Sequence, residues 1–245
     1  MLDIKTVYAG YLKKLNEDNR INRYEDRESW FHASSSGMCM RKIYYNSVEQ
    51  VESTEIDDNT LRLFRLGDLV HNDIQDALVK HGQKEKIDVL IEQEIRIQDI
   101  NVRGFFDICI VDDDAMYDVK TCNSFKWRNL FGRTPDPEPA ENYALQLGTY
   151  AYWYQQKYGV ELKKLALVYY NKDNSLMREV NVPKSFIIKA YEYWKDVNER
   201  FKIGIPEVSL GTAPVYEWEC NVKYCGYFNH CGGGLKGQTK WTKGR

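Results

Sequence analysis

The stretch that decides the fold is VRGFFDICIVDDDAMYDVKT, residues 102–121. It contains two strand-like runs, 102–111 and 115–121, in which β-branched, aromatic and other apolar residues dominate. Three consecutive Asp residues at 112–114 separate the runs, and residues of this kind favour turns. The pattern predicts two antiparallel strands joined as a hairpin.

Both strands of this hairpin carry polar residues. Asp118 and Lys120 are two residues apart, so their side chains point to one face of their strand. A two- or four-residue turn within 111–114 places Asp107 directly opposite Asp118 on that face. A three-residue loop without a bulge would separate them. The sequence permits the first register without requiring it.

Around the hairpin, helical and strand patterns alternate. Apolar residues at helical spacing predict helices, and short apolar runs between turn residues predict strands. Helices are expected at 4–15, 38–45, 60–81, 140–158 and 183–202, and further strands at 89–97, 163–170 and 176–182. A helix, an antiparallel meander and a crossover helix indicate an α/β fold with a mixed central sheet flanked by helices.

The composition excludes several classes of protein. Of 245 residues, 43% are hydrophobic and 13% aromatic, which excludes disordered and collagen-like chains. The longest apolar stretches are too short to span a bilayer, so we expect a soluble protein with no membrane partner. With 34 Lys and Arg against 36 Asp and Glu, the formal charge is −2, and any nucleic-acid surface must be local. The first residues lack a secretory signal pattern, which favours a reducing, cytoplasmic location.

Asp107, Asp118 and Lys120 would bring two carboxylates and an ammonium group together in an otherwise apolar sheet. Buried charges need compensation, and a divalent cation supplies it. Hard oxygen ligands favour Mg²⁺ or Mn²⁺, and Lys120 would orient an attacking water or stabilise transition-state charge. An isolated D-x-K pattern is, however, more often a surface hairpin whose side chains are solvated or ion-paired.

Three more polar residues lie on predicted helix faces. His71 is seven residues from both Phe64 and Leu78, so it faces inward with the apolar stripe. A lone inward histidine is more often a hydrogen-bonded core residue than a metal ligand. Gln146 and Tyr150 share one face of their helix, and this pair alone indicates only packing.

In combination and order, these patterns resemble the signature of the PD-(D/E)XK nuclease superfamily, especially its RecB-type exonucleases. The motifs are G-x-x-x-H at 67–71, G-x-x-D at 104–107, D-x-K at 118–120 and Q-x-x-x-Y at 146–150. The resemblance implies a restriction-endonuclease-like fold. It implies metal binding by His71, Asp107 and Asp118, catalysis by Lys120, and active-site or DNA-contacting roles for Gln146 and Tyr150. Phe106 stands before the first carboxylate, where Pro is usual.

The cysteines refine this resemblance. Cys39 stands alone near the N-terminus, and Cys220, Cys225 and Cys231 lie within twelve residues. This layout, with the segment SSSGMCMRKIYY at 34–45, resembles the iron-sulfur members, including CRISPR-associated accessory nucleases and the nuclease domain of bacterial helicase-nucleases. It implies a structural iron-sulfur cluster of the 4Fe-4S type held by these four thiolates, which also suit zinc.

One spacing departs from that family. The late motif is C-x(4)-C-x(5)-C, whereas the family usually has C-x(2)-C-x(5)-C, and Val222 stands where a cysteine is usual. Cys220 can still reach the cluster if the loop bulges, and His230 is an alternative ligand. Cys109 and Cys122 lie in or next to predicted strands, where we expect structural thiols.

These features predict a metal-dependent DNA exonuclease acting on DNA ends or single strands. Its parts would be an N-terminal helical segment (1–58), a nuclease core (59–182) and a C-terminal helix with the cysteine-rich segment (183–245). The resemblance implies a setting in recombination, repair or CRISPR spacer acquisition, with partners from those systems.

Two alternatives are a noncatalytic DNA- or partner-binding protein on the same fold and a zinc-stabilised nuclease. A binding role does not require Asp107, Asp118 and Lys120 together, which favours the enzyme. The basic tail at 236–245 has no acidic residue and is either a DNA-contacting arm or disordered.

Overall fold

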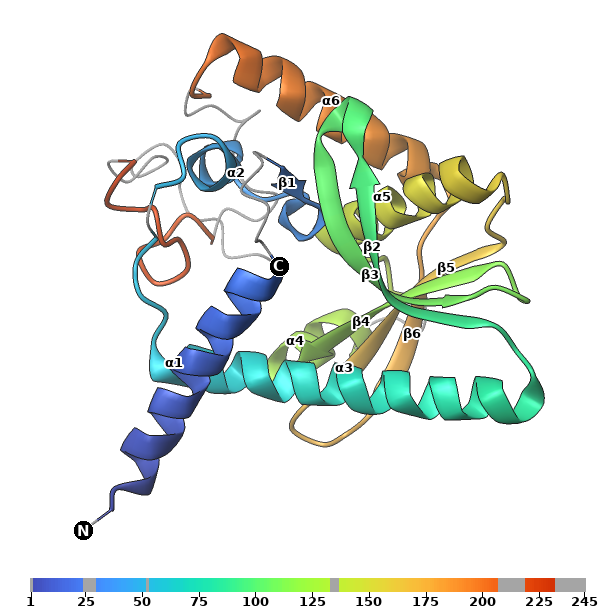
Figure 1. Ribbon diagram of the computed structural model, residues 1–245, viewed down its shortest axis with the longest axis horizontal. Coiled ribbons are helices and arrows are strands. Elements are labelled where there is room, and N and C mark those ends of the chain that lie inside the picture. Colours follow the sequence, from blue (N-terminus) through green and yellow to red (C-terminus); the bar gives the residue numbers. More distant parts are fainter. Residues whose placement is uncertain (1, 24–29, 52, 133–136, 207–218, 232–245) are drawn as a thin grey trace.

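A mixed six-stranded sheet forms the centre of the protein (Figure 1). The computed structural model describes residues 2–23, 30–51, 53–132, 137–206 and 219–231. The strand order is β1-β3-β4-β5-β6, and β2 pairs with the second edge of β3. The strands are β1 (Phe31–His32), β2 (Val89–Ile97), β3 (Val102–Ile110), β4 (Ala115–Cys122), β5 (Lys164–Asn171) and β6 (Met177–Asn181).

β3 and β4 pair over only three residues before they diverge. Their partners are Ile108 with Tyr117, Cys109 with Met116 and Ile110 with Ala115. This pairing closes the hairpin through the four residues 111–114 and confirms the register that brings Asp107 and Asp118 together. β4 pairs in parallel with β5 along its whole length, and the first residues of β3 pair in parallel with β1. We call the divergence at Asp107 and Asp118 the sheet fork.

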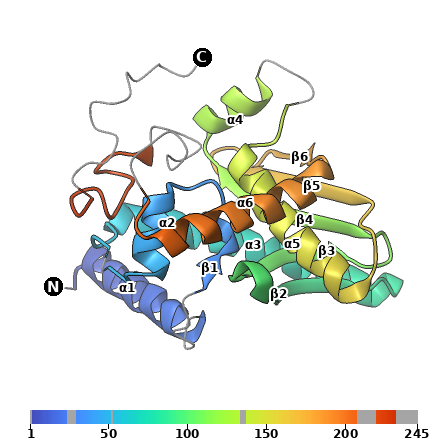
Figure 2. The same cartoon turned by 90° about the horizontal axis from the view of Figure 1, so that it is seen from above.

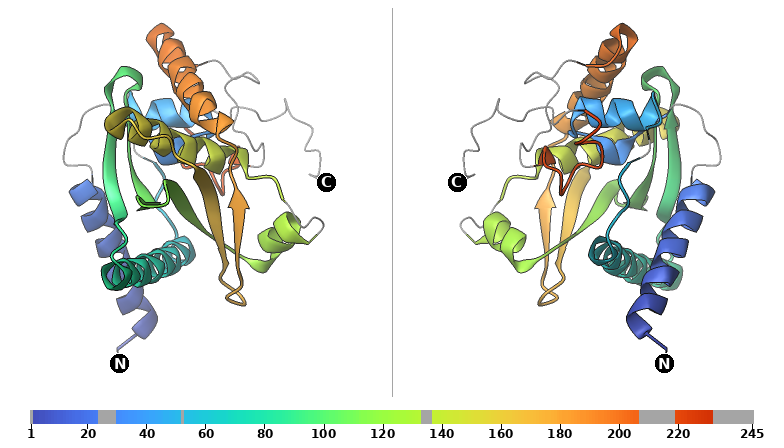
Figure 3. Two further views of the ribbon diagram at one scale, coloured as in Figure 1. Left: turned by 90° about the vertical axis from the view of Figure 1, so that its right-hand side faces the viewer. Right: turned by 90° about the vertical axis from the view of Figure 1, so that its left-hand side faces the viewer.

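Helices cover both faces of the sheet (Figure 3). α3 lies on one face, α5 and α6 lie on the other, and α1 packs against α3. The helices are α1 (Ile4–Arg23), α2 (Met40–Ser47), α3 (Asp58–Glu85), α4 (Ser124–Phe131), α5 (Glu141–Tyr158) and α6 (Ser185–Ile203), with short 3₁₀ turns η1 (Ala33–Ser35) and η2 (Gln98–Ile100). The arrangement confirms the expected α/β class. None of the helices in the described ranges is long and apolar enough to cross a bilayer.

Local chemistry explains where the long helices begin and end. The Asp57 side chain accepts hydrogen bonds from the backbone N–H groups of Asn59 and Thr60 and so caps α3. Gly159 ends α5 with φ of 67°, a left-handed conformation that suits glycine. Within α5, Gly148 lets α6 approach closely, because a Cβ there would collide with the Phe186 carbonyl oxygen.

The two ends of the described chain meet around α2. Phe31 of β1 stacks on Trp194 of α6, with ring centroids 5.9 Å apart. The Tyr227 hydroxyl donates to Asn46 Oδ1 at 3.1 Å, and Thr54 N–H donates to the Gly226 carbonyl at 3.2 Å. The N-terminal segment and residues 219–231 therefore lie together.

Three elements differ from the sequence expectation. The two-residue strand β1 and the helix α4 were not predicted, and both are too short to show a clear period. The expected apolar stripe of α1 is largely exposed, with Leu12 buried but Tyr8 and Tyr11 open to solvent. The basic tail at 236–245 lies outside the described residues, and the three-part division of the chain stays a prediction.

Candidate active site

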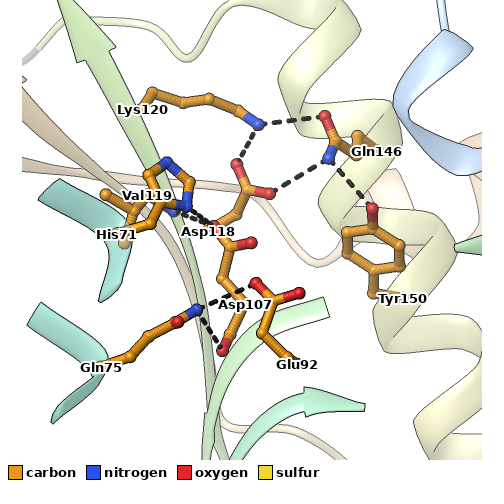
Figure 4. Close-up of polar contacts among 9 residues, drawn as sticks. All are labelled: His71, Gln75, Glu92, Asp107, Asp118, Val119, Lys120, Gln146 and Tyr150. Atoms are coloured by element: carbon orange, nitrogen blue, oxygen red, sulfur yellow. Dashed lines mark hydrogen bonds and ion pairs between the residues drawn. The ribbon is translucent and has the colours of Figure 1, made fainter. Parts of the chain in front are cut away.

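The sheet fork places two carboxylates in the interior of the protein. Asp118 is fully buried and Asp107 is 8% exposed. The backbones of β3 and β4 no longer pair there, so a backbone N–H of β4 bonds to a side chain of β3. Val119 N–H donates to Asp107 Oδ2 at 2.7 Å (Figure 4). The backbone pairing ends at Ile108 and Tyr117, one position before Asp107 and Asp118, and the Asp107 side chain bridges the strands where they separate.

Asp118, Lys120, Gln146 and Tyr150 form one connected polar chain (Figure 4). Lys120 Nζ lies 2.6 Å from Asp118 Oδ2 and donates to Gln146 Oε1 at 3.1 Å. The Gln146 amide donates to Asp118 Oδ1 at 3.2 Å and lies 3.0 Å from the Tyr150 hydroxyl. The structure thus brings the D-x-K and Q-x-x-x-Y motifs together.

His71 and Gln75 reach the fork from the opposite helix, α3. His71 Nδ1 lies 3.4 Å from Asp107 Oδ2, so the inward histidine faces a predicted ligand. Gln75, one turn later, donates to the Asp107 carbonyl at 3.3 Å and to Glu92 Oε1 at 3.1 Å. Burial lowers the pKa of His71, although the Asp118 charge opposes this. The imidazole is therefore held in the neutral form, which is the form that binds metal ions.

Burial and neighbouring charges shift the pKa values of the titratable groups at the fork. Burial, and then the Asp118 charge, raise the pKa of Asp107 well above its ordinary value. Burial would lower the pKa of Lys120, but the Asp118 and Asp107 carboxylates outweigh it and raise that pKa. Lys120 is therefore a stable cation, and Asp107 resists ionisation.

Two motif glycines differ in what they do. A Cβ on Gly104 would lie 3.0 Å from both Tyr150 Cε1 and Ala33 Cβ, so the glycine of G-x-x-D lets Tyr150 approach β3. A Cβ on Gly67 would meet Thr121 Oγ1 at 3.5 Å, an ordinary contact. The space that Gly67 leaves beside His71 is therefore not needed for packing.

Sequence reasoning missed Glu92 and Gln75. The β2–β3 register places Glu92 opposite Asp107, between the pairs Ile91–Ile108 and Gln93–Phe106. Glu92 adopts φ of 47°, a left-handed conformation that is unusual inside a strand and is found where function imposes strain. Two signals in the sequence could have found them: Gln75 follows His71 by one helical turn, and Glu92 interrupts an apolar run.

The donor atoms at the fork suit a divalent cation. Carboxylate oxygens and a neutral imidazole are ligands for Mg²⁺ or Mn²⁺. Asp118 Oδ2 is buried and accepts no well-oriented hydrogen bond within the described part of the chain, although Lys120 Nζ is close. As the side chains stand, no three His, Cys, Asp or Glu residues in the described ranges are arranged to hold a metal ion. Ion binding would require Asp107 and Asp118 to turn toward a common point.

The cysteines fall into two groups. Cys109 and Cys122 are buried in the core, as predicted. Cys39 precedes α2, and its pKa is raised by burial and further by Cys220 and Cys225. Burial likewise raises the pKa of Cys225, with smaller contributions from Cys231 and Cys220. All four predicted cluster ligands are free thiols, and as their side chains stand no three of them are arranged to hold a metal ion in the described part of the chain.

His230 does not join that group in the present arrangement. Its ring packs edge-on against Tyr45 at 4.7 Å, and its Nε2 lies 3.8 Å from Glu49 Oε2. Its role as an alternative ligand stays a prediction.

Comparison with known proteins places the fold among solved structures. No family model and no curated protein matches this chain. The crystal structure of SSO0001 is similar, with 20% identity, a TM-score of 0.57, and coverage of 96% of this chain and 100% of that one.

Two exonuclease structures are also similar. A candidate exonuclease from Eubacterium rectale has 12% identity and a TM-score of 0.50, and the match covers 78% of this chain and 87% of that one. An alkaline exonuclease from Laribacter hongkongensis has 12% identity, a TM-score of 0.46 and coverage of 74% and 92%. At these identities the likeness concerns the fold alone: the Eubacterium rectale structure shares the mixed α/β fold of this chain.

Proposed function

We propose that this protein is a metal-dependent DNA exonuclease of the PD-(D/E)XK type that hydrolyses phosphodiester bonds at DNA ends or in single strands. One observation carries the proposal: Lys120 and Asp118 form a buried pair, 2.6 Å apart, at a fork of the sheet that also receives Asp107 and His71. Burying these groups is costly, and a sheet built only for stability would have apolar residues here.

In this proposal His71, Asp107 and Asp118 hold Mg²⁺ or Mn²⁺. Such an ion, when bound, lowers the pKa of a bound water and stabilises charge on a phosphoryl oxygen. Lys120 offers its ammonium group to the scissile phosphate, where negative charge increases in the transition state. Gln146 fixes the Lys120 ammonium and the Asp118 carboxylate relative to each other, and Tyr150 fixes Gln146.

The proposal includes a structural iron-sulfur cluster held by Cys39, Cys220, Cys225 and Cys231. The segment around α2 meets residues 219–231 through the Tyr227–Asn46 and Thr54–Gly226 hydrogen bonds, and this meeting of the two cysteine-bearing segments supports it. Thiolates are the ligands of iron-sulfur clusters, and zinc is the alternative occupant.

End-labelled DNA tests the function. Linear single-stranded, linear double-stranded and circular single-stranded DNA are incubated with protein purified without oxygen, in Mg²⁺, Mn²⁺ or EDTA. We expect shortening of linear DNA with either metal, none in EDTA, and intact circles. Asp118→Asn should lower the rate by about 10³-fold or more, since it removes a ligand and the Lys120 partner.

Asp114→Asn is the matched control. Asp114 lies at the turn of the same hairpin and pairs with Lys163 at 2.8 Å, away from the fork, so its loss should leave cleavage unchanged. Folded wild-type protein that cleaves no substrate in either metal, or an Asp118→Asn protein with full activity, would reject the proposed function.

A further inference from the structure

The unpredicted helix α4 is fixed beside the candidate active site. It begins four residues after Lys120, at Ser124, whose backbone N–H donates to Asp173 Oδ2 at 2.7 Å. Asn123 caps it by accepting from Lys126 N–H at 2.9 Å. Its Phe131 ring packs on Tyr169 of β5, with centroids 5.7 Å apart. α4 therefore has a defined position at the edge of the molecule (Figure 2).

Tyr143 connects α4 to the fork. It lies on α5 three residues before Gln146, so the two side chains share one helix face. The Lys126 ammonium donates to the Tyr143 hydroxyl at 3.0 Å and lies 4.6 Å from the ring centroid. Lys120 Nζ lies 4.7 Å from the same centroid. Two ammonium groups are thus neighbours around a single aromatic ring.

The two cations differ in their compensation. Lys120 has the Asp118 carboxylate at 2.6 Å. Lys126 has no carboxylate within ion-pair distance in the part of the chain that the structure describes; Glu219 feels its charge only at longer range. Like charges close together repel, and the aromatic ring offsets this only partly. An anion beside Lys126 would remove the imbalance.

We propose that Lys126, positioned by Tyr143, binds the phosphate adjacent to the scissile one in the nucleic-acid strand. This inference rests on the proposed function, because it takes Lys120 to mark the scissile phosphate. It assigns a binding role to Lys126 and a positioning role to Tyr143. The contact reads the backbone and not the bases, so it sets affinity and the placement of the strand without selecting sequence.

Salt-dependent binding tests the site. A fluorescent single-stranded oligonucleotide is titrated with full-length protein in EDTA, which prevents cleavage, at several salt concentrations. Lys126→Met should reduce the slope of log K against log salt by about 0.7, the value for one phosphate on a single strand. That reduction in slope corresponds to about eightfold weaker binding at 50 mM salt.

Two further variants separate position from charge. Arg128→Met removes an exposed cation from the same helix and should leave the slope unchanged. Tyr143→Phe keeps the ring and removes the hydroxyl that holds Lys126, so binding should weaken by a smaller factor than in Lys126→Met, while the slope stays closer to that of wild type. An unchanged slope in Lys126→Met, or equal losses in Lys126→Met and Arg128→Met, would overturn the proposal.

Parallel cleavage assays in Mn²⁺ keep the two proposals distinct. If wild type cleaves DNA and Lys126→Met changes neither binding nor KM, the phosphate site is rejected and the nuclease is retained. If Lys126→Met weakens binding but wild type does not cleave DNA, the nuclease is rejected and a phosphate site is retained. Wild-type protein that neither binds nor cleaves rejects both.

Discussion

The sheet fork and the cysteine region are held together in different ways. At the fork, His71, Asp107, Asp118, Lys120 and Gln146 come from α3, β3, β4 and α5, and each makes a short contact with another member. In the cysteine region, residues 220–231 form turns without a helix or strand, and the described cysteines are free thiols of which no three are arranged to hold a metal ion.

The two regions differ in how much of their structure the sheet and helices hold in place. The sheet and its two helix layers determine the fork, whatever binds there. The cysteine region has a few packing contacts, such as Tyr45 on Tyr227 at 5.8 Å, and would gain its organisation from a metal. Loss of a ligand should therefore change chemistry at the fork and stability in the cysteine region.

The largest effect is expected from breaking the buried pair at the fork. Lys120→Met leaves the Asp118 carboxylate buried without a cation, which should cost about 3–5 kcal/mol of unfolding free energy in metal-free protein. Lys120→Met combined with Asp118→Asn should recover most of this loss, because neither charge then remains. Urea unfolding of the single and double variants measures the coupling. Additive losses would show that the pair contributes nothing as a pair.

Removing a cluster ligand should have the next largest effect. Cys39→Ala should remove the brown colour and absorbance near 400 nm of protein purified without oxygen, and destabilise it by roughly 3 kcal/mol, as expected when a cross-link closing a very long loop is lost. Cys231→Ala should do the same. Cleavage by whatever protein stays folded should persist, because the fork does not depend on the cysteines for its contacts.

Cys109→Ala is the control for colour. Cys109 is buried in β3 away from the other thiols, so the colour should remain. Colourless protein with stoichiometric zinc would replace the cluster with a zinc site. Protein with neither metal would contradict the cluster and leave the grouping of four thiols without a physical reason.

The next variant is His71→Asn, which tests whether His71 is a metal ligand or a core residue. His71→Asn should lower cleavage by about 10²-fold or more while costing less than 1 kcal/mol, since the side chain touches the Asp107 carboxylate at the edge of the core. A structural histidine would instead cost on the order of 1–3 kcal/mol through an unsatisfied polar group. Melting and cleavage measured on one preparation distinguish the two. Full activity would leave the metal with carboxylates only.

Much of this molecule could be predicted from the sequence, and the reason is local. The apolar runs on either side of 112–114 were enough to predict the hairpin, and apolar residues at helical spacing were enough to predict α3 and α5. The register of Asp107 and Asp118 needed only the turn length. These features depend on neighbours in the chain, so a single sequence contains them.

What could not be predicted depends on pairing between distant segments. Glu92 joins the fork because β2 pairs with β3 in a particular register and adopts a left-handed conformation there. Lys126 joins it because α4 packs on Tyr169, and the contact with Tyr143 follows from that packing. Neither the strained backbone nor the docking of an eight-residue helix leaves a periodic signal.

Asp107→Asn tests the stability of the metal-free protein, and its expected effect depends on pH. Burial and the Asp118 charge raise the pKa of Asp107 well above its ordinary value. The native state therefore holds this proton more tightly than the unfolded chain does. Its stabilising contribution is complete below the unfolded pKa and is lost as pH rises through the folded pKa. Asn never ionises and still accepts the Val119 N–H, so the variant avoids that loss.

In EDTA, the two proteins should melt together at about pH 3, and Asp107→Asn should melt higher as pH increases toward 9. A difference of about 1 kcal/mol would appear as about 2–4 °C in a chain of this size. Saturating Mn²⁺ should reverse the order, because an ion that binds only the native wild-type carboxylates stabilises that protein alone. Thermal melts across this pH range, with and without Mn²⁺, measure both effects. If wild type were the more stable protein in EDTA at pH 9, the fork would already balance the Asp107 charge, and it would not need the cation that the proposed function requires.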